Sequence, residues 1–369
     1  MKKLILSILK YASLPFALLY GLVVFLRNKF YDLGIFNSIE FSLPVICVGN
    51  ITVGGTGKSP HIEYLIELLS TRYKVATLSR GYGRHSRGFR IADPHTNARE
   101  IGDEPYQFKS KYPFVEVAVA EERMTAIPQL LQRKPQLDII LLDDAFQHRT
   151  VRAGFNILLT DYGRLFTKDY IMPFGLLRES RKAAKRAQTI IVSKCPPDMS
   201  EKEKLELTRS ILPLPGQTIY FSSIVYQNIY PLTPDAPHPN SATEILLVCG
   251  IANPEPLVAH LKTKFKTVNL LRFKDHHYYT DEDIEEIKAA FDHIKTTNKT
   301  ILTTEKDAAR LMLHKDLIHK HQLPFFAQGI RTRFLFNEGE AFNEEITRFV
   351  QQYIPDLPQD EIYEEITPQ

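Results

Sequence analysis

The sequence is poor in three features that each define a class of protein: cysteine clusters, net charge and long apolar runs. Its three cysteines, Cys47, Cys195 and Cys249, lie far apart and form no Cys-x-x-Cys pair, which argues against a zinc site. We expect them to be reduced, buried thiols of a cytosolic protein. A formal net charge of +3 over 369 residues gives no reason to expect a nucleic-acid partner.

The apolar N-terminal stretch also falls short of a membrane span. Residues 11–26 are uncharged and are flanked by Lys10, Arg27 and Lys29, whereas a spanning helix needs about 20 apolar residues. No small-residue cleavage site follows, so the segment does not resemble a signal peptide. We expect residues 1–35 to form a membrane-associated helix, either interfacial or a short anchor, whose basic flanks are attracted to anionic lipid. The alternative is a buried first helix.

Alternating strand and helix patterns begin at residue 43. The segment "LPVICVGN" (residues 43–50) is a continuous apolar run, which is typical of a strand buried on both faces. Helical periodicity follows at Ile62, Leu65, Ile66 and Leu69. Because this strand–loop–helix order repeats along the chain, the sequence predicts a parallel sheet with right-handed crossovers.

The segment "VGNITVGGTGKSP" (residues 48–60) contains most of a phosphate-binding loop. The pattern G-x-x-x-x-G-K-[ST] requires glycine at position 52, where this chain has Thr52. Backbone N–H groups and a helix N-terminus can still surround phosphates, with Lys58 reaching the β- and γ-phosphates and Ser59 binding Mg²⁺. Pro60 suits a first helical turn, where its missing N–H needs no partner. The predicted ATP-binding residues are Thr52, Val53, Gly54, Gly55, Thr56, Gly57, Lys58 and Ser59.

A stretch with four prolines, residues 230–243, indicates a boundary between two α/β units. We expect a P-loop nucleotide-binding domain over residues 36–225, a second α/β lobe over 226–355 and an acidic tail over 356–369. The predicted fold class is therefore α/β: a P-loop NTPase-like parallel-sheet domain with a second, smaller α/β lobe and an N-terminal membrane-associated helix.

Two carboxylates end the strand predicted from "LDIILLDD" (residues 137–144). Asp143 and Asp144 follow four apolar residues, and ligands bind at the carboxyl ends of parallel strands. These side chains are candidates to hold Mg²⁺ or its waters beside the phosphates, the alternative being a solvated strand end. Gln147 and His148 continue the same loop, where a lone histidine is more often structural or solvated.

Three further polar clusters are less specific. Asp103 and Glu104 precede a helix, and capping of its N-terminus is the default interpretation. His276 and His277 are adjacent, so their side chains point apart, and no third ligand is spaced for zinc. Basic residues concentrated in segment 178–186 form either a solvated helical face or a surface for lipid phosphates.

Seven segments resemble, in order, the tetraacyldisaccharide 4′-kinase family of lipid A biosynthesis: "VGNITVGGTGKSP", "SRGYG", "GDEP", "LLDDAFQHR", "PFGLLRES", "FKDHHYY" and "TTEKDAARL". The similarity runs from near residue 40 to about residue 312. The family's loop also lacks the first glycine, so Thr52 follows its pattern. At Ala145 the family often has glycine; a methyl group fits there if φ is negative and adds strain if φ is positive.

The resemblance implies transfer of the γ-phosphoryl group of ATP, with Mg²⁺ as cofactor, to the 4′-hydroxyl of tetraacyldisaccharide 1-phosphate. It places this reaction at the cytoplasmic face of a Gram-negative inner membrane, with the protein bound peripherally or by a single N-terminal anchor. The implied partners are the lipid A disaccharide precursor and the membrane lipid surface, without nucleic acid or an obligate protein partner.

The family's site residues are carried over position by position. The implied catalytic residues are Asp103, His276, Lys58 and Arg178. Asp103 would take the proton of the acceptor alcohol, and His276 would orient this carboxylate from the second lobe. The implied magnesium residues are Ser59, Glu104, Asp143 and Asp144. The implied acceptor-site residues are Arg123, Gln147, His148 and Glu179.

A membrane-associated P-loop switch ATPase that controls a protein partner is the alternative from another class. The glycine loop and the apolar N-terminal segment alone also fit such a protein. It needs neither His276 from a second lobe nor a basic acceptor patch, and it would hydrolyse ATP without phosphorylating a lipid.

Overall fold

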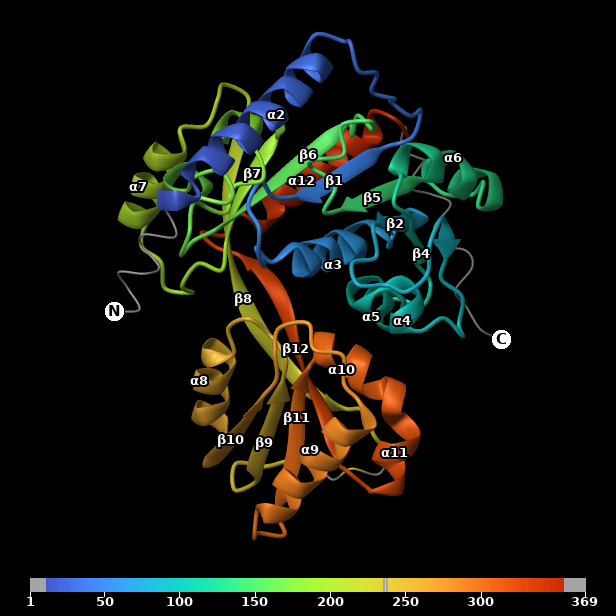
Figure 1. The fold of residues 1–369 in the computed structure, drawn as a ribbon, viewed down its shortest axis with the longest axis vertical. Coiled ribbons are helices and arrows are strands. Elements are labelled where there is room, and N and C mark those ends of the chain that lie inside the picture. Colours follow the sequence, from blue (N-terminus) through green and yellow to red (C-terminus); the bar gives the residue numbers. More distant parts are fainter. Residues whose placement is uncertain (1–10, 235, 237, 355–369) are drawn as a thin grey trace.

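A computed structural model describes residues 11–234, 236 and 238–354 of the chain (Figure 1). Twelve described strands form one mostly parallel sheet that runs through two lobes. From one edge to the other the strands are β10 (Thr267–Arg272), β9 (Glu244–Cys249), β11 (Lys299–Thr304), β12 (Phe325–Phe334), β8 (Thr218–Pro231), β7 (Thr189–Ser193), β6 (Phe155–Asp161), β1 (Val45–Gly49), β5 (Ile139–Asp143), β2 (Val75–Ser79), β4 (Glu116–Val119) and β3 (Arg90–Ile91). The predicted α/β class with a large parallel sheet is confirmed.

The first lobe is built on the strands from β3 to β7. Strands β1 and β5 lie side by side at its centre, and every residue of both is buried. This burial explains their continuous apolar sequences, because helices cover both faces of a parallel sheet. The helices of this lobe are α3 (Lys58–Leu69), α4 (Ala98–Ile101), α5 (Asp103–Lys111), α6 (Arg123–Arg133), α7 (Glu201–Ile211) and α12 (Gly339–Gln351), with short 3₁₀ turns at Phe166–Lys168 and Arg181–Arg186.

Two long antiparallel strands, β8 and β12, connect the second lobe to the first (Figure 1). The first residues of β8 pair with β7, and the rest of the strand pairs with β12, so the sheet continues from one lobe into the other. Strands β12, β11, β9 and β10 are parallel. The helices of this lobe are α8 (Glu255–Lys264), α9 (Asp281–His293), α10 (Glu305–Leu311) and α11 (Lys315–Lys320), with a 3₁₀ turn at Met312–His314.

After β12 the chain returns to the first lobe. In α12, Phe342, Ile346 and Val350 are buried in the core that also contains residues of β1 and α3. The ring of Phe342 stacks on Phe334 with 4.5 Å between centroids. The structure therefore differs from the expected second lobe of residues 226–355, because α12 packs with the nucleotide-binding lobe. The expected acidic tail, 356–369, lies outside the described residues.

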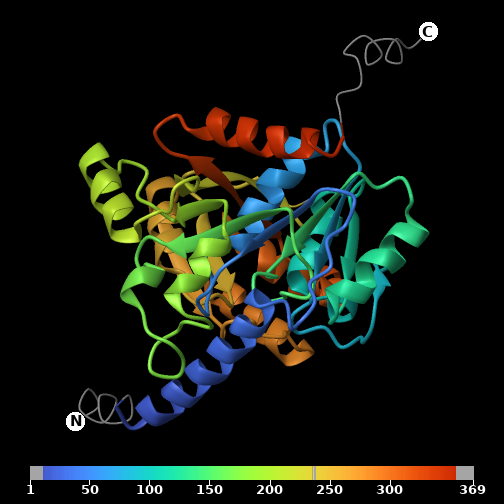
Figure 2. The same ribbon diagram turned by 90° about the horizontal axis from the view of Figure 1, so that it is seen from above.

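Helix α2 (Leu14–Asp32) exposes most of its apolar side chains. Phe16 and Leu18 are 68% and 66% exposed, and Ala17 is the one buried residue of this helix. Figure 2 shows the N-terminal end of α2 extending beyond the rest of the fold. This exposure argues against the alternative of a buried first helix. Within the described part of the chain, no helix is both long enough and apolar enough to cross a bilayer.

Candidate active site

The glycine-rich segment forms a loop between β1 and α3. Gly57 precedes the helix with φ +78°, and Gly54 has φ +112°; both conformations favour glycine. A Cβ at Gly54 or Gly55 would meet no described atom within 4 Å. Asn50 Nδ2 donates to Thr56 Oγ1 at 2.9 Å, a buried hydrogen bond that connects the start of the loop to its end. The loop thus presents open backbone at the N-terminus of α3, the arrangement that binds phosphates.

The structure explains why Thr52 replaces the usual first glycine. Thr52 forms an antiparallel bridge with Leu177, and its side chain is buried. On either side, Val53 N donates to Leu176 O and Arg178 N donates to Ile51 O, both at 2.8 Å. This extended pairing requires no left-handed residue. It also brings Arg178 beside the loop.

The end of β7 supports the loop from the other side, which the sequence reasoning missed. Ser193 Oγ donates to Thr56 O at 2.8 Å, and Lys194 Nζ donates to Gly55 O. Lys194 also pairs with Asp161 at 2.9 Å. Ser193 ends an apolar strand and Lys194 follows it, but only the strand order, with β7 two places from β1, puts them against the loop.

The predicted magnesium residues converge beside Lys58 and Ser59. Ser59 Oγ donates to Glu104 Oε1 at 3.1 Å, and Lys58 Nζ lies 3.6 Å from Asp144 Oδ1. Asp143 is buried, and its Oδ1 has no hydrogen-bond partner among the described residues. The site therefore offers one hydroxyl and three carboxylates on one side of the phosphate loop.

Two of these carboxyls have strongly shifted pKa values in opposite directions. Burial, aided by the negative charge of Glu104, raises the pKa of Asp143 to about 7. Burial also acts on Glu104, but the ammonium groups of Lys306 and Lys58 outweigh it and lower the pKa of Glu104 to about 2. A pair of carboxyls separated in this way is characteristic of a functional site.

Asp103 and His276 meet across the two lobes. His276 Nδ1 lies 3.7 Å from Asp103 Oδ2, and Arg310 of α10 is 3.5 Å from the same oxygen. Asp103 is the first residue of α5, after the N-cap residue Gly102, and its Oδ1 has no hydrogen-bond partner among the described residues, so Asp103 is not the residue that caps this helix. The Tyr82 ring packs edge-on against His276 at 5.5 Å. His276 has φ +57°, a conformation rare for a non-glycine residue and frequent at functional sites.

Four residues predicted for the acceptor site, together with Arg178, lie around the 144–149 loop. Arg178 donates to Asp144 at 3.1 Å and to Gln147 Oε1 at 3.4 Å. Gln147 in turn donates to Asn50 O at 2.9 Å. Burial, with the positive charge of Arg123, lowers the pKa of His148 to about 4.

Arg123 and Glu179 are the most deeply buried of this set. The Arg123 side chain is 0% exposed, and its Nη1 donates to Ala120 O at 3.0 Å. Its Nε and Nη2 are buried and have no hydrogen-bond partner in the described chain. Glu179, in contrast, is held by Arg186 and by Asn28, each at 2.8 Å.

The departure at Ala145 costs no backbone strain. Ala145 is buried, and it is Asp144 before it that has positive φ, +49°. Asp tolerates the left-handed region better than most residues.

Sequence reasoning also missed Lys306 and Arg310. Lys306 Nζ lies 2.5 Å from Glu104 Oε1, and Arg310 contacts both Asp103 and Asp307. Both occur in the motif "TTEKDAARL". Their charges were visible in the sequence, but their positions depend on how the second lobe faces the first.

The residues fit ATP and Mg²⁺ when both are considered together. In the part of the chain that the structure covers, no three His, Cys, Asp or Glu side chains form a metal site by themselves. Magnesium is commonly held by one or two carboxylates together with substrate phosphates and water. The partnerless oxygen of Asp143 and the Ser59 hydroxyl, next to the phosphate loop, match that requirement.

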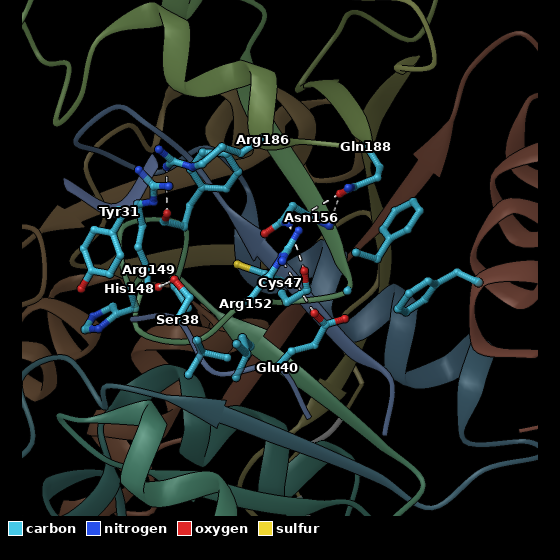
Figure 3. A pocket seen from close by; sticks show the side chains of 18 of the residues that line it. Tyr31, Ser38, Glu40, Cys47, His148, Arg149, Arg152, Asn156, Arg186 and Gln188 are labelled. Atoms are coloured by element: carbon cyan, nitrogen blue, oxygen red, sulfur yellow. Dashed lines mark hydrogen bonds and ion pairs between the residues drawn. The ribbon is translucent and has the colours of Figure 1, made fainter. Parts of the chain in front are cut away.

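A separate cavity of about 980 Å³ lies between the segment after α2, the 145–156 loop and α12 (Figure 3). Of the predicted site residues, only His148 lines it, so it is distinct from the phosphate loop. Cys47 faces this cavity, and burial raises the pKa of its thiol to about 12. All three cysteines are free and buried, as the sequence predicted.

Comparison with known proteins gives one consistent result. The tetraacyldisaccharide-1-P 4′-kinase family model matches residues 9–351. The tetraacyldisaccharide 4′-kinase of Bacteroides thetaiotaomicron is 46% identical over 352 residues, covering 92% of each chain. That of Flavobacterium johnsoniae is 44% identical and covers 94% of this chain and 98% of its own.

Among solved structures, LpxK from Aquifex aeolicus in complex with ATP has a TM-score of 0.70 and 27% identity. The match covers 93% of this chain and 99% of that one. With the phosphate loop, the carboxylates and the second-lobe histidine all in place, the chain belongs to the tetraacyldisaccharide-1-phosphate 4′-kinase family.

Proposed function

We propose that this protein transfers the γ-phosphoryl group of ATP to the 4′-hydroxyl of tetraacyldisaccharide 1-phosphate in lipid A biosynthesis. The observation that carries the proposal is the meeting of Asp103 and His276 next to the phosphate loop that ends in Lys58 and Ser59. A loop and a membrane-binding helix alone fit a switch ATPase equally well. The full-length similarity to kinases of this name favours lipid phosphorylation.

Asp103 is suited to act as the general base. Its Oδ1 is buried without a partner among the described residues, and Oδ2 faces both His276 and Arg310. Asp103 takes the proton of the 4′-hydroxyl as that oxygen bonds to the γ-phosphorus, while the bond between the γ-phosphorus and the β,γ-bridging oxygen breaks and ADP leaves. An alcohol is a weak nucleophile at neutral pH, so such a base contributes about 10²- to 10⁴-fold.

Positive groups around the phosphate loop stabilise the charge that is transferred. Lys58 binds the β- and γ-phosphates, and Arg178 is positioned by Asp144 and Gln147 to meet charge developing in the transition state. Mg²⁺, held by Ser59, Glu104, Asp143 and Asp144, would supply further neutralisation of the phosphate oxygens. These assignments are the ones the sequence suggested, and their proximity supports them.

Arg123, Gln147, His148 and Glu179 are proposed to serve the acceptor. The two partnerless nitrogens of Arg123 are suited to an anionic group such as the phosphate already on the disaccharide. Glu179 acts indirectly, by positioning neighbouring side chains, because its carboxylate oxygens accept hydrogen bonds from Asn28 of α2 and from Arg186. Helix α2 is thereby tied to the acceptor loop.

The exposed face of α2 supports membrane binding, which an acceptor with four acyl chains would require. We propose that the protein works at the cytoplasmic face of the inner membrane, bound peripherally or by a single N-terminal anchor, with the lipid surface and the disaccharide precursor as its partners. Apolar side chains exposed on a helix with basic flanks bind anionic bilayer surfaces. We propose neither a nucleic-acid partner nor an obligate protein partner.

The test is to incubate detergent-purified protein with γ-labelled ATP, Mg²⁺ and tetraacyldisaccharide 1-phosphate. We expect label on the lipid, and a loss of at least about 100-fold in Lys58→Ala, Asp103→Ala and His276→Ala. His319→Ala, an exposed histidine on α11, is the matched control and should keep full activity. Release of free phosphate without labelled lipid would instead support the switch ATPase.

A further inference from the structure

The first turn of α10 faces both ends of α5 across the boundary between the lobes. Glu305 begins α10, and its Oε1 lies 3.1 Å from Lys111 Nζ at the end of α5. The next residue, Lys306, places its Nζ 2.5 Å from Oε1 of Glu104 at the start of α5. Each helix thus offers one acid and one base to the other. The acid comes first in both helices, so the two ion pairs are crossed.

The sequence of α10 explains how neighbouring residues reach partners so far apart. Consecutive side chains of an α-helix point about 100° apart, since a turn takes 3.6 residues. Thr304 caps the helix by accepting from Asp307 N at 3.1 Å, which fixes where the first turn begins. Glu305 and Lys306 are therefore directed to two different ends of α5.

Glu305 is joined to both strands that connect the lobes and, through Lys111, to the phosphate-loop helix. Ile330 N of β12 donates to its Oε2 at 3.3 Å, and Tyr230 of β8 donates to its Oε1 at 3.4 Å. Lys111 Nζ also lies 2.7 Å from Glu63 Oε2 on α3. Both Glu305 and Glu63 have side chains only 5% exposed, so little water competes for these contacts.

Lys306 occupies a position that its own helix disfavours. A cation in the first turn is repelled by the positive end of the helix dipole, so the neighbouring acids must stabilise it. Glu104 Oε1, which Lys306 contacts, also accepts from Ser59 Oγ at 3.1 Å. One carboxylate oxygen is therefore shared by a hydroxyl of the phosphate loop and an ammonium of the second lobe.

We propose that Lys306 is a positioning residue for phosphoryl transfer: it fixes Glu104 beside Ser59, and the Lys111–Glu305 pair fixes Lys306. Correct placement of Glu104 then depends on the position of the second lobe. The catalytic consequence rests on the proposed kinase function. The effect on the relative position of the lobes does not rest on that function, and it can be measured in the absence of turnover.

The kinetic test compares Lys306→Gln and Lys306→Arg in the lipid kinase assay. We expect Lys306→Gln to lower kcat by at least about 30-fold with KM for ATP changed less than about threefold, because alignment rather than ground-state binding is lost. Lys306→Arg keeps a donor and a charge and should recover most of the rate. Lys320→Gln, an exposed lysine on α11, should match the parent. A kcat for Lys306→Gln within threefold of the parent, or no recovery by arginine, overturns the proposal.

The structural test measures the distance between the lobes in the nucleotide-free protein. Spin labels at Gln132→Cys on α6 and Lys262→Cys on α8, both exposed, report one lobe each, since the native cysteines are buried. Adding Glu305→Gln or Lys306→Gln should broaden the distance distribution, whereas adding Lys320→Gln should not. An unchanged distribution in both variants refutes the positioning role. If these variants broaden the distribution but the parent protein phosphorylates no lipid, the kinase function is discarded and the inter-lobe contact is retained.

Discussion

Replacing Asp143 by asparagine removes a negative charge that the fold keeps away from water. Asp143 is 2% exposed, and its Oδ1 has no described hydrogen-bond partner. Burial and the charge of Glu104 raise its pKa from 3.8 to about 7. Folding therefore disfavours the anion, and Asp143 can serve as an anionic ligand only in its deprotonated form.

The raised pKa fixes the sign of the effect on stability and sets its order of magnitude. A carboxyl with a raised folded-state pKa contributes full stability below pH 3.8 and loses it as pH rises to about 7. At about 1.4 kcal/mol per pKa unit, the loss approaches about 4 kcal/mol at pH 8. Asparagine cannot ionise, so Asp143→Asn should be more stable than the parent at pH 8 by up to that amount. The advantage should fall by more than half at pH 5.

Urea denaturation at pH 8 and pH 5 tests this expectation. EDTA and the absence of nucleotide keep the site free of metal, and the difference between the two pH values reports the charge. Asp316→Asn, an exposed aspartate on α11, is the matched control and should change little at either pH. The reasoning is refuted if Asp143→Asn gains no more stability at pH 8 than at pH 5. Lipid kinase activity should fall in this variant even as stability rises.

Two further substitutions test the packing that positions the site. The Phe342 side chain is 1% exposed and stacks on Phe334. Phe342→Ala leaves a cavity there and should lower the free energy of unfolding, measured with urea, by about 3–5 kcal/mol. Phe114→Ala, 68% exposed, should change it by less than about 0.5 kcal/mol, and equal effects would contradict the place assigned to α12. Gly49→Ala puts a Cβ 2.6 Å from Phe146 Cβ and should cost about 1–3 kcal/mol with weaker ATP binding; an unchanged urea midpoint would show that this contact relaxes freely.

Local features of the sequence were sufficient to predict the nucleotide-binding element. The apolar run before residue 50, the glycines at 54, 55 and 57, and the helical periodicity after Pro60 each act within a few residues. The structure accordingly has β1 over Val45–Gly49 and α3 from Lys58. Asp143 likewise ends β5, because a charge at the end of a buried apolar run marks the carboxyl edge of a strand.

Contacts between distant segments were not readable from such patterns. The place of α12 could not be predicted, because its apolar stripe shows only that one face is buried and does not indicate the lobe that buries it. Thr52 departs from the usual loop pattern because its backbone is extended and forms an antiparallel bridge with Leu177, a residue far away in the sequence. Family resemblance assigned His276 to Asp103, but no local signal joins them.

The sequence by itself thus determined the α/β class, the phosphate loop and the kinds of side chain available for chemistry. Only the tertiary structure decided which of them meet. Strands β8 and β12 connect the second lobe to the first. In the resulting arrangement His276 and Arg310 lie beside Asp103, and Lys306 contacts Glu104. Such contacts join residues far apart in the chain, and they form only because the pairing of those two strands fixes one lobe against the other.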